Sequence, residues 1–139
     1  MKKFNIRVYG ILKNESDAVL ISKEKHQRLN ITKFPGGGLE WGEGTKEALI
    51  REFKEEMDLD IEVLELFYLT DFFQESAFNP EDQLISVYYL VKAKKLHEIL
   101  PKATESHEVQ SWVSIDDLHE EDLTFPIDKH VAQLLRQKK

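Results

Sequence analysis

Cysteine is absent from the 139-residue sequence. The chain therefore has no disulfide framework, no thiolate zinc or iron–sulfur site and no cysteine nucleophile. Long apolar runs are also missing, because no stretch approaches the roughly 18 residues that a membrane-spanning helix requires. The first residues alternate in polarity instead of forming the apolar block of a signal peptide. We therefore expect a cytoplasmic protein that does not bind membranes.

Positive charge is scarce relative to negative charge. The chain carries 19 Lys and Arg residues against 26 Asp and Glu residues, which gives a formal net charge of −7. Attraction to a nucleic-acid polymer depends on clustered basic residues, so this balance argues against DNA or RNA as a partner. A small anion whose charge is shielded by metal ions remains compatible with the composition.

The length and the apolar content are those of one globular domain. With 41% hydrophobic residues, a chain of this length buries roughly 70% of its unfolded surface and needs no metal or disulfide to hold a core. We expect a single domain over residues 1–139.

Local patterns predict strands and helices in a mixed order. We expect a hairpin of residues 4–12 and 18–22, a glycine-containing loop from residue 34, and a helix capped by Thr45 and running to about Met57. A second hairpin of residues 61–70 and 83–93, a strand at 111–115 and a helix at 128–136 complete the chain. Hairpins imply a mixed or antiparallel sheet, and a helix on each face would bury both sides. The predicted fold class is an α/β/α sandwich.

Three carboxylates crowd one flank of the first predicted helix. Glu52, Glu55 and Glu56 are spaced i, i+3 and i+4, and like charges so placed destabilise a helix by about 0.2–0.5 kcal/mol per pair. Their place near the helix C-terminus adds to the cost, because the helix dipole favours cations there. The alternative is an acidic face that is simply solvated.

A glycine-rich turn directly precedes this helix and changes the balance between these readings. Residues 36–44 contain five glycines, which let the backbone approach a ligand closely. Mg²⁺ prefers oxygen ligands and completes its shell with water and substrate phosphate. Turn and helix together therefore favour a divalent-metal site.

The stretch from Gly37 to Leu59 resembles the Nudix box of the Nudix hydrolase family. The matching residues are Gly37, Glu43, Arg51, Glu52, Phe53, Glu55, Glu56 and Leu59. One position departs from the pattern, since Asp58 stands where the family has a late glycine. The exchange matters if this residue adopts a left-handed helix cap, which Asp tolerates less well than glycine but better than most residues.

The resemblance implies a Nudix-type α/β/α fold with a mixed sheet and a metal-dependent hydrolase. Such enzymes cleave a diphosphate linkage in a nucleoside diphosphate joined to another group, using Mg²⁺ or Mn²⁺. Carried over by position, Glu52, Glu55 and Glu56 would be metal ligands, together with the carbonyl of Gly36.

The resemblance also gives roles to charged residues beside the metal ligands. Arg51 would orient the site through a charge-assisted bond to Glu43; the alternative is a surface pair with Glu47, one turn earlier. Glu52 is the first choice for the general base, and Glu105 and Glu108 are alternatives on a later loop.

Residues near the C-terminus point to a purine nucleotide. Phe125-Pro126 resembles an element that branches acting on oxidised purine nucleotides place near the base, and Asp128 could then accept hydrogen bonds from a purine edge. The alternative is that Phe125 belongs to the core and Asp128 caps the last helix. Other aromatic residues that could stack on a base are Trp41, Phe73 and Phe78.

The sequence therefore predicts a nucleoside triphosphate pyrophosphatase of the oxidised purine deoxynucleotide type. The alternatives are an ADP-ribose or nucleotide-sugar pyrophosphatase and a non-catalytic nucleotide-sensing Nudix module. A basic run of Lys23, Lys25, Arg28 and Lys33 either attracts phosphates or is a solvated loop. The apolar loop around Phe72, Phe73 and Phe78 is a candidate homodimer surface.

Overall fold

The computed structural model describes residues 1–95 and 108–138 of the chain. Strands and helices follow one another in this part as β1 (Lys3–Leu12), β2 (Ala18–His26), β3 (Leu29–Lys33), β4 (Gly36–Gly38), α1 (Thr45–Met57), β5 (Ile61–Leu69), β6 (Asp82–Ala93), β7 (Val109–Ser114), η2 (Ile115–Asp117), η3 (Glu120–Asp122) and α2 (Pro126–Gln137). None of the helices in these ranges is long and apolar enough to cross a membrane.

The strands form two sheets. The larger is mixed and has the order β4-β1-β6-β5, with β1 parallel to β6 and antiparallel to β4. The smaller is antiparallel and has the order β3-β2-β7. The predicted hairpin of β5 and β6 is confirmed, and its pairing is interrupted by irregularities near Leu66.

The predicted opening hairpin is wrong. A single bridge between Lys13 and Val19 closes the turn after β1, and then β1 and β2 enter different sheets. Strand β1 instead pairs with β6 along its whole length, from Lys3 opposite Asp82 to Leu12 opposite Val91. The turn residues were identified correctly, but the distant strand β6 is the stronger partner for β1.

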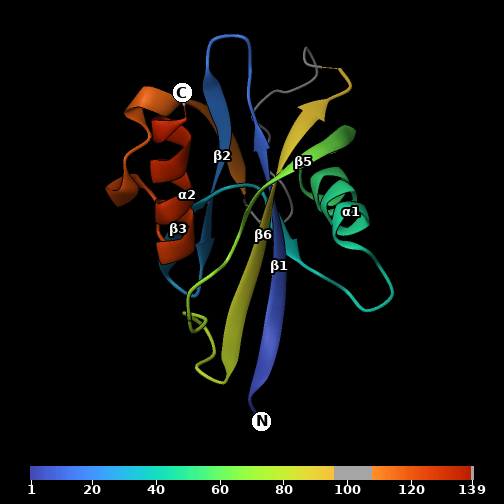
Figure 1. Ribbon diagram of the computed structural model, residues 1–139, viewed down its shortest axis with the longest axis vertical. Coiled ribbons are helices and arrows are strands. Elements are labelled where there is room, and N and C mark those ends of the chain that lie inside the picture. The colour runs from blue at the N-terminus through green and yellow to red at the C-terminus, as the bar shows by residue number, and fades with distance from the viewer. Residues whose placement is uncertain (96–107, 139) are drawn as a thin grey trace.

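Both faces of the strands are covered, which confirms the α/β/α fold class (Figure 1). Side chains alternate along β1, so Tyr9 and Ile11 join the core cluster under α2 whereas Val8 and Leu12 join the cluster under α1. Figure 1 shows the two helices on opposite sides of the strands.

Helix α1 has the predicted bounds but not the predicted cap. The N-cap is Gly44, and its N–H donates to Glu47 Oε1 at 3.1 Å. Thr45 instead shares a 2.7 Å hydrogen bond with the Tyr89 hydroxyl. Ile50 is 43% exposed and lies outside the core, because it is at the edge of the apolar sector that Leu49 and its neighbours bury.

Asp58 ends α1 in the left-handed conformation, with φ 53° and ψ 39°. Its N–H donates to the carbonyl of Lys54 at 3.0 Å, and its carboxylate lies 3.0 Å from the Lys54 ammonium. The residue that replaces the late glycine of the Nudix box therefore does take the cap geometry that glycine favours.

The three glycines form a short strand, β4, rather than the predicted loop. Gly36 pairs with Tyr9 and Gly37 with Val8 of β1. At Gly36 the φ angle is +151°, and a Cβ atom would come within 2.0 Å of the Val8 carbonyl oxygen. Only glycine fits this close approach to β1.

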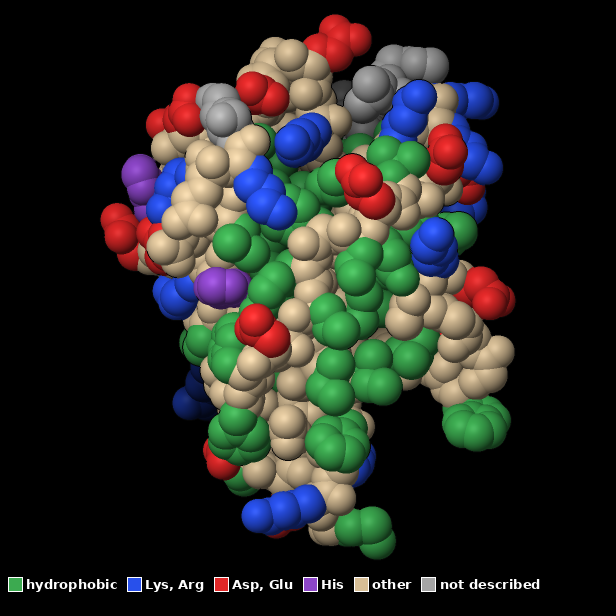
Figure 2. Space-filling view, viewed as in Figure 1, with side chains coloured by type: hydrophobic (Ala, Val, Ile, Leu, Met, Phe, Trp, Pro, Cys, Tyr) green, Lys and Arg blue, Asp and Glu red, His purple; other side chains and the backbone are tan. Residues whose placement is uncertain are grey.

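Apolar side chains gather over the strands at the centre of the face that Figure 2 shows. On β5 the exposed large apolar residues are Leu64, Leu66 and Leu69, and in the loop after it Phe72 and Phe73 are 38% and 66% exposed. The homodimer surface proposed around this loop stays a prediction.

Candidate active site

Arg51 joins the glycine turn to helix α1. Its Nε donates to Glu43 Oε2 at 3.0 Å and its Nη2 donates to Glu43 Oε1 at 2.6 Å, which is a bidentate pair. Nη2 also donates to the Gly38 carbonyl at 3.0 Å. The predicted bond to Glu43 is confirmed, and the alternative partner Glu47 bonds Gly44 instead. The hydrogen bonds from Arg51 lower the pKa of Glu43, and Glu43 in turn raises the pKa of Arg51.

Glu52 points from α1 back at the glycine strand. Its side chain is almost buried, and Oε1 accepts a hydrogen bond from Arg51 Nη1 at 3.1 Å. A Cβ atom at Gly37 would lie 2.5 Å from this carboxylate, so glycine there leaves the space that Glu52 fills. Burial raises the pKa of Glu52 and outweighs the opposing effect of Arg51.

Glu55 lies on the outer side of the same arginine. Its Oε2 is 3.2 Å from Arg51 Nη1, and its side chain is 59% exposed. Arg51 therefore contacts two of the three predicted metal ligands, Glu52 and Glu55, from the same nitrogen.

Glu56 faces Glu108, the residue just before β7. Glu108 is 1% exposed, and Glu56 Oε2 is buried with no hydrogen-bond partner within residues 1–95 and 108–138. Burial and the neighbouring Glu108 carboxylate raise the pKa of Glu56 to about 8. Burial alone would raise the pKa of Glu108, but a hydrogen bond with Glu56 and the charge of Lys33 outweigh burial and lower this pKa. Glu105, the other predicted alternative base, lies outside the described residues.

Lys33 is a buried cation whose charge lowers the pKa of both Glu56 and Glu108. It is 6% exposed, its Nζ donates to the Gly36 carbonyl at 3.3 Å, and it lies 3.7 Å from Glu24. Burial is the largest influence and lowers its pKa, but Tyr9, Glu108 and Glu24 together raise the pKa above its ordinary value. Lys23, Lys25 and Arg28, the other members of the basic run, are exposed.

The predicted metal ligands are close together in the fold but are not gathered around one point. Glu52, Glu55 and Glu56 share a helix flank, and the Gly36 carbonyl lies on the neighbouring strand. In the described part of the chain, no three acidic or histidine side chains are grouped closely enough to hold a metal ion as they stand.

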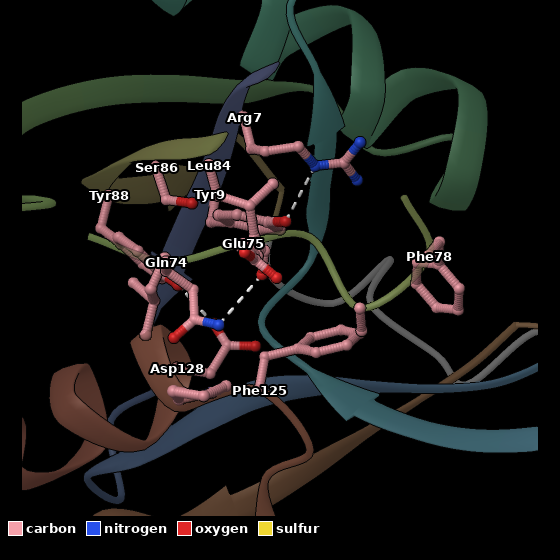
Figure 3. Close-up of a pocket in the computed structure, with 13 residues that line it drawn as sticks. Arg7, Tyr9, Gln74, Glu75, Phe78, Leu84, Ser86, Tyr88, Phe125 and Asp128 are labelled. Carbon is pink, nitrogen blue, oxygen red and sulfur yellow. Dashed lines mark hydrogen bonds between the residues drawn. The ribbon is translucent and has the colours of Figure 1, made fainter. Parts of the chain in front are cut away.

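A pocket opens between β1, β6, residues 74–78 and the start of α2 (Figure 3). It is lined by Arg7, Tyr9, Gln74, Glu75, Ala77, Phe78, Leu84, Ser86, Tyr88, Phe125, Pro126, Ile127 and Asp128. The Phe78 and Phe125 rings meet edge to face with centroids 6.1 Å apart. Trp41 is fully exposed, and neither it nor Phe73 lines this pocket.

Asp128 closes the pocket on the side of α2. It is 2% exposed and accepts a 2.5 Å hydrogen bond from the Tyr88 hydroxyl. The N-cap of α2 is Phe125, so the alternative role of Asp128 as the helix cap is wrong. Burial raises the pKa of Asp128 to about 7 even though the Tyr88 hydrogen bond opposes this.

Arg7, Tyr9 and Tyr88 line the pocket but are not among the site residues predicted from the sequence. The signal was present in the alternation of β1, where Asn5, Arg7 and Tyr9 occupy the same side as the buried Ile11. A polar residue on the core-facing side of a strand marks either a buried hydrogen bond or a binding site.

Comparison with known proteins relates almost the whole chain to one family. A family model described as NUDIX domain matches residues 3–135. An 8-oxo-dGTP diphosphatase from Escherichia coli (strain K12) is 27% identical over 98% of this chain and 99% of its own length. A MutT protein of the Nudix hydrolase family from methicillin-resistant Staphylococcus aureus 252 is 27% identical, with a TM-score of 0.69 and full coverage of both chains.

A more divergent structure shows the shared fold alone. A Nudix hydrolase from Nitrosomonas europaea is 19% identical and superposes with a TM-score of 0.78 over 99% of this chain and 91% of that one. Because the family match spans almost the whole sequence and includes the charged residues of the box, the chain belongs to the Nudix family and is a MutT-like Nudix pyrophosphohydrolase.

Proposed function

We propose that this protein hydrolyses nucleoside triphosphates to nucleoside monophosphates and pyrophosphate, with Mg²⁺ or Mn²⁺, and that oxidised purine deoxynucleotides are its preferred substrates. One observation carries the proposal: the Arg51–Glu43 pair holds the carboxylate helix beside an aromatic pocket that ends on Asp128. The diphosphatase activity in the name of the E. coli relative, which is similar along nearly the whole chain, supports the same substrate class.

The residues present fit a divalent cation. Glu56 Oε2 is a buried acceptor without a hydrogen-bond partner among the residues described, and its pKa is raised because burial and the neighbouring Glu108 outweigh the opposing charge of Lys33. Glu52, Glu55 and Glu56 with the Gly36 carbonyl would hold the metal, and this all-oxygen set suits Mg²⁺ or Mn²⁺. The exposed side chain of Glu55 can rotate away from Arg51 to join them. When bound, such an ion neutralises charge on the diphosphate and makes a bound water more acidic.

The protein groups then position and deprotonate the attacking water. Glu52 accepts a proton as the water oxygen bonds to phosphorus and the bond to the leaving pyrophosphate breaks. Arg51, held by Glu43, keeps Glu52 aimed at the glycine strand. Glu108 is the alternative base.

The pocket supplies the contacts for a purine. Phe78 and Phe125 present aromatic surface at its walls, and base stacking on such rings contributes about 1–3 kcal/mol per base. Asp128 offers a carboxyl group to the edge of the base, and Tyr88 holds that group in place. A hydrogen-bonded base edge discriminates more strongly than apolar contact alone.

A substrate panel tests the proposal. Purified protein with MgCl₂ is assayed on dGTP, 8-oxo-dGTP, ATP, ADP-ribose and dinucleoside polyphosphates, and the products are separated by chromatography. We expect 8-oxo-dGTP to have the highest kcat/KM and to give 8-oxo-dGMP and pyrophosphate. A preference for ADP-ribose would refute the substrate class, and binding without any turnover would favour a nucleotide-sensing role.

A further inference from the structure

Arg7 occupies the side of the pocket opposite Asp128, as Figure 3 shows. On β1 it is paired with Gly38 of β4 and with Ser86 of β6. A Cβ atom at Gly38 would lie 3.4 Å from Arg7 Nη1, so the guanidinium lies close to the glycine strand. The carbonyl of the same Gly38 accepts a hydrogen bond from Arg51. Arg7 and the charged residues of the Nudix box therefore meet at one strand.

The guanidinium of Arg7 uses only one of its hydrogen-bond donors within the described residues. Its Nε donates to the Tyr9 hydroxyl at 3.1 Å, and no second acceptor for the side chain is found within residues 1–95 and 108–138. A guanidinium carries five N–H donors. The two terminal nitrogens of a half-buried arginine at the edge of a pocket are therefore available to a ligand.

The charge of Arg7 is coupled to charged groups of the carboxylate cluster. Tyr9 is the main cause that raises the pKa of Arg7, and the negative charges of Glu52 and Glu24 raise it further. Arg7 in turn lowers the pKa of Lys33, which bonds the Gly36 carbonyl. The guanidinium thus interacts with residues of the carboxylate cluster while it lines the aromatic pocket.

We infer that Arg7 is a substrate-positioning residue that binds the phosphate adjoining the nucleoside, the one that the monophosphate product retains. The inference rests on the proposed function, in which the base enters the aromatic pocket and the scissile diphosphate lies at the carboxylates. The first phosphate then lies between them, at the place that Arg7 occupies. The fork of guanidinium N–H groups matches the oxygens of a phosphate.

Binding of the product and of its nucleoside separates this role from recognition of the base. Affinities of 8-oxo-dGMP and 8-oxo-deoxyguanosine are measured by calorimetry for the wild type, R7Q and R7K, without metal. We expect R7Q to bind the monophosphate about 10- to 100-fold more weakly than the wild type, because a hydrogen bond to a charged group is lost. Its affinity for the nucleoside should stay within about threefold of the wild-type affinity. R7K keeps the charge but loses the fork, so its affinity for the monophosphate should be intermediate.

K13Q is the control that removes one positive charge elsewhere, because Lys13 is exposed just after β1 and does not line the pocket. It should bind both ligands like the wild type. Equal weakening of monophosphate and nucleoside in R7Q, no weakening of either, or a wild type that does not prefer the monophosphate would each overturn the inference. If the expected pattern appears but nucleoside triphosphates are not hydrolysed, the proposed function fails and the role of Arg7 stands.

Discussion

Replacing Asp128 with asparagine should make the protein more stable at neutral and alkaline pH but not at acidic pH. Asp128 is 2% exposed, and burial raises its pKa from the ordinary 3.8 to about 7. The folded protein therefore binds this proton more tightly than the unfolded chain does. Stability falls as the pH rises from about 4 to about 7 and stays lower above that range.

The size of the effect follows from the shift in pKa. One pKa unit corresponds to about 1.4 kcal/mol, so a rise from 3.8 to about 7 gives an upper limit of about 4 kcal/mol. The side chain is almost completely buried, so solvent screening reduces this figure little. In D128N the amide oxygen can still accept the Tyr88 hydrogen bond, and the cost of ionisation disappears.

Urea unfolding of D128N and the wild type at several values between about pH 4 and pH 8 tests this reasoning. The difference in unfolding free energy should be small at the acidic end and should grow to a few kcal/mol in favour of D128N above about pH 7. D17N removes the same charge at an exposed turn and serves as the matched control. A difference that does not change with pH would refute the assignment of a buried, proton-binding Asp128.

Three further predictions concern the carboxylate cluster. E56Q should lower kcat at least about 100-fold and leave the protein at least as stable as the wild type, because the cost of burying an ionisable carboxyl beside Glu108 disappears. Extensive unfolding in a denaturant titration would show that Glu56 is structural instead. Mg²⁺ at 100 times its Kd should stabilise the wild type by about 2.7 kcal/mol, seen as a higher Tm, and E56Q should lose most of the shift. G37A places a Cβ atom 2.5 Å from the Glu52 carboxylate. The substitution should displace this carboxylate and lower kcat about 100-fold or more. A G37A enzyme with full activity and a native circular dichroism spectrum would contradict the close contact between residue 37 and Glu52.

The sequence predicted best those elements whose signals are local. The apolar spacing of α1 gave its bounds, and the matched charges of the box gave the contact between Arg51 and Glu43. The one position that departs from the Nudix box was also informative, since Asp58 takes the left-handed conformation that a glycine at this helix end would favour. Each of these features depends on residues within about two turns of helix or one adjoining turn.

What could not be predicted depends on contacts between distant segments. The turn before Ala18 was recognisable, but nothing near it shows that β1 pairs with β6. The same long-range pairing brings Tyr88 and Arg7 to one pocket, so the residues lining it could not be assembled from either segment alone. The burial of Glu108 beside Glu56 likewise depends on β7 pairing with β2.

Strand β1 connects the two halves of the candidate site. On one side its backbone pairs with β4, whose glycines leave room for Glu52 and offer the Gly38 carbonyl to Arg51. Its side chains at Arg7 and Tyr9 line the aromatic pocket. Because paired strands move together, a change that shifts β1 would displace the pocket and the carboxylates at once. Substitutions in the apolar side chains beneath β1 should therefore affect binding and turnover together, whereas substitutions at the pocket mouth should affect binding alone.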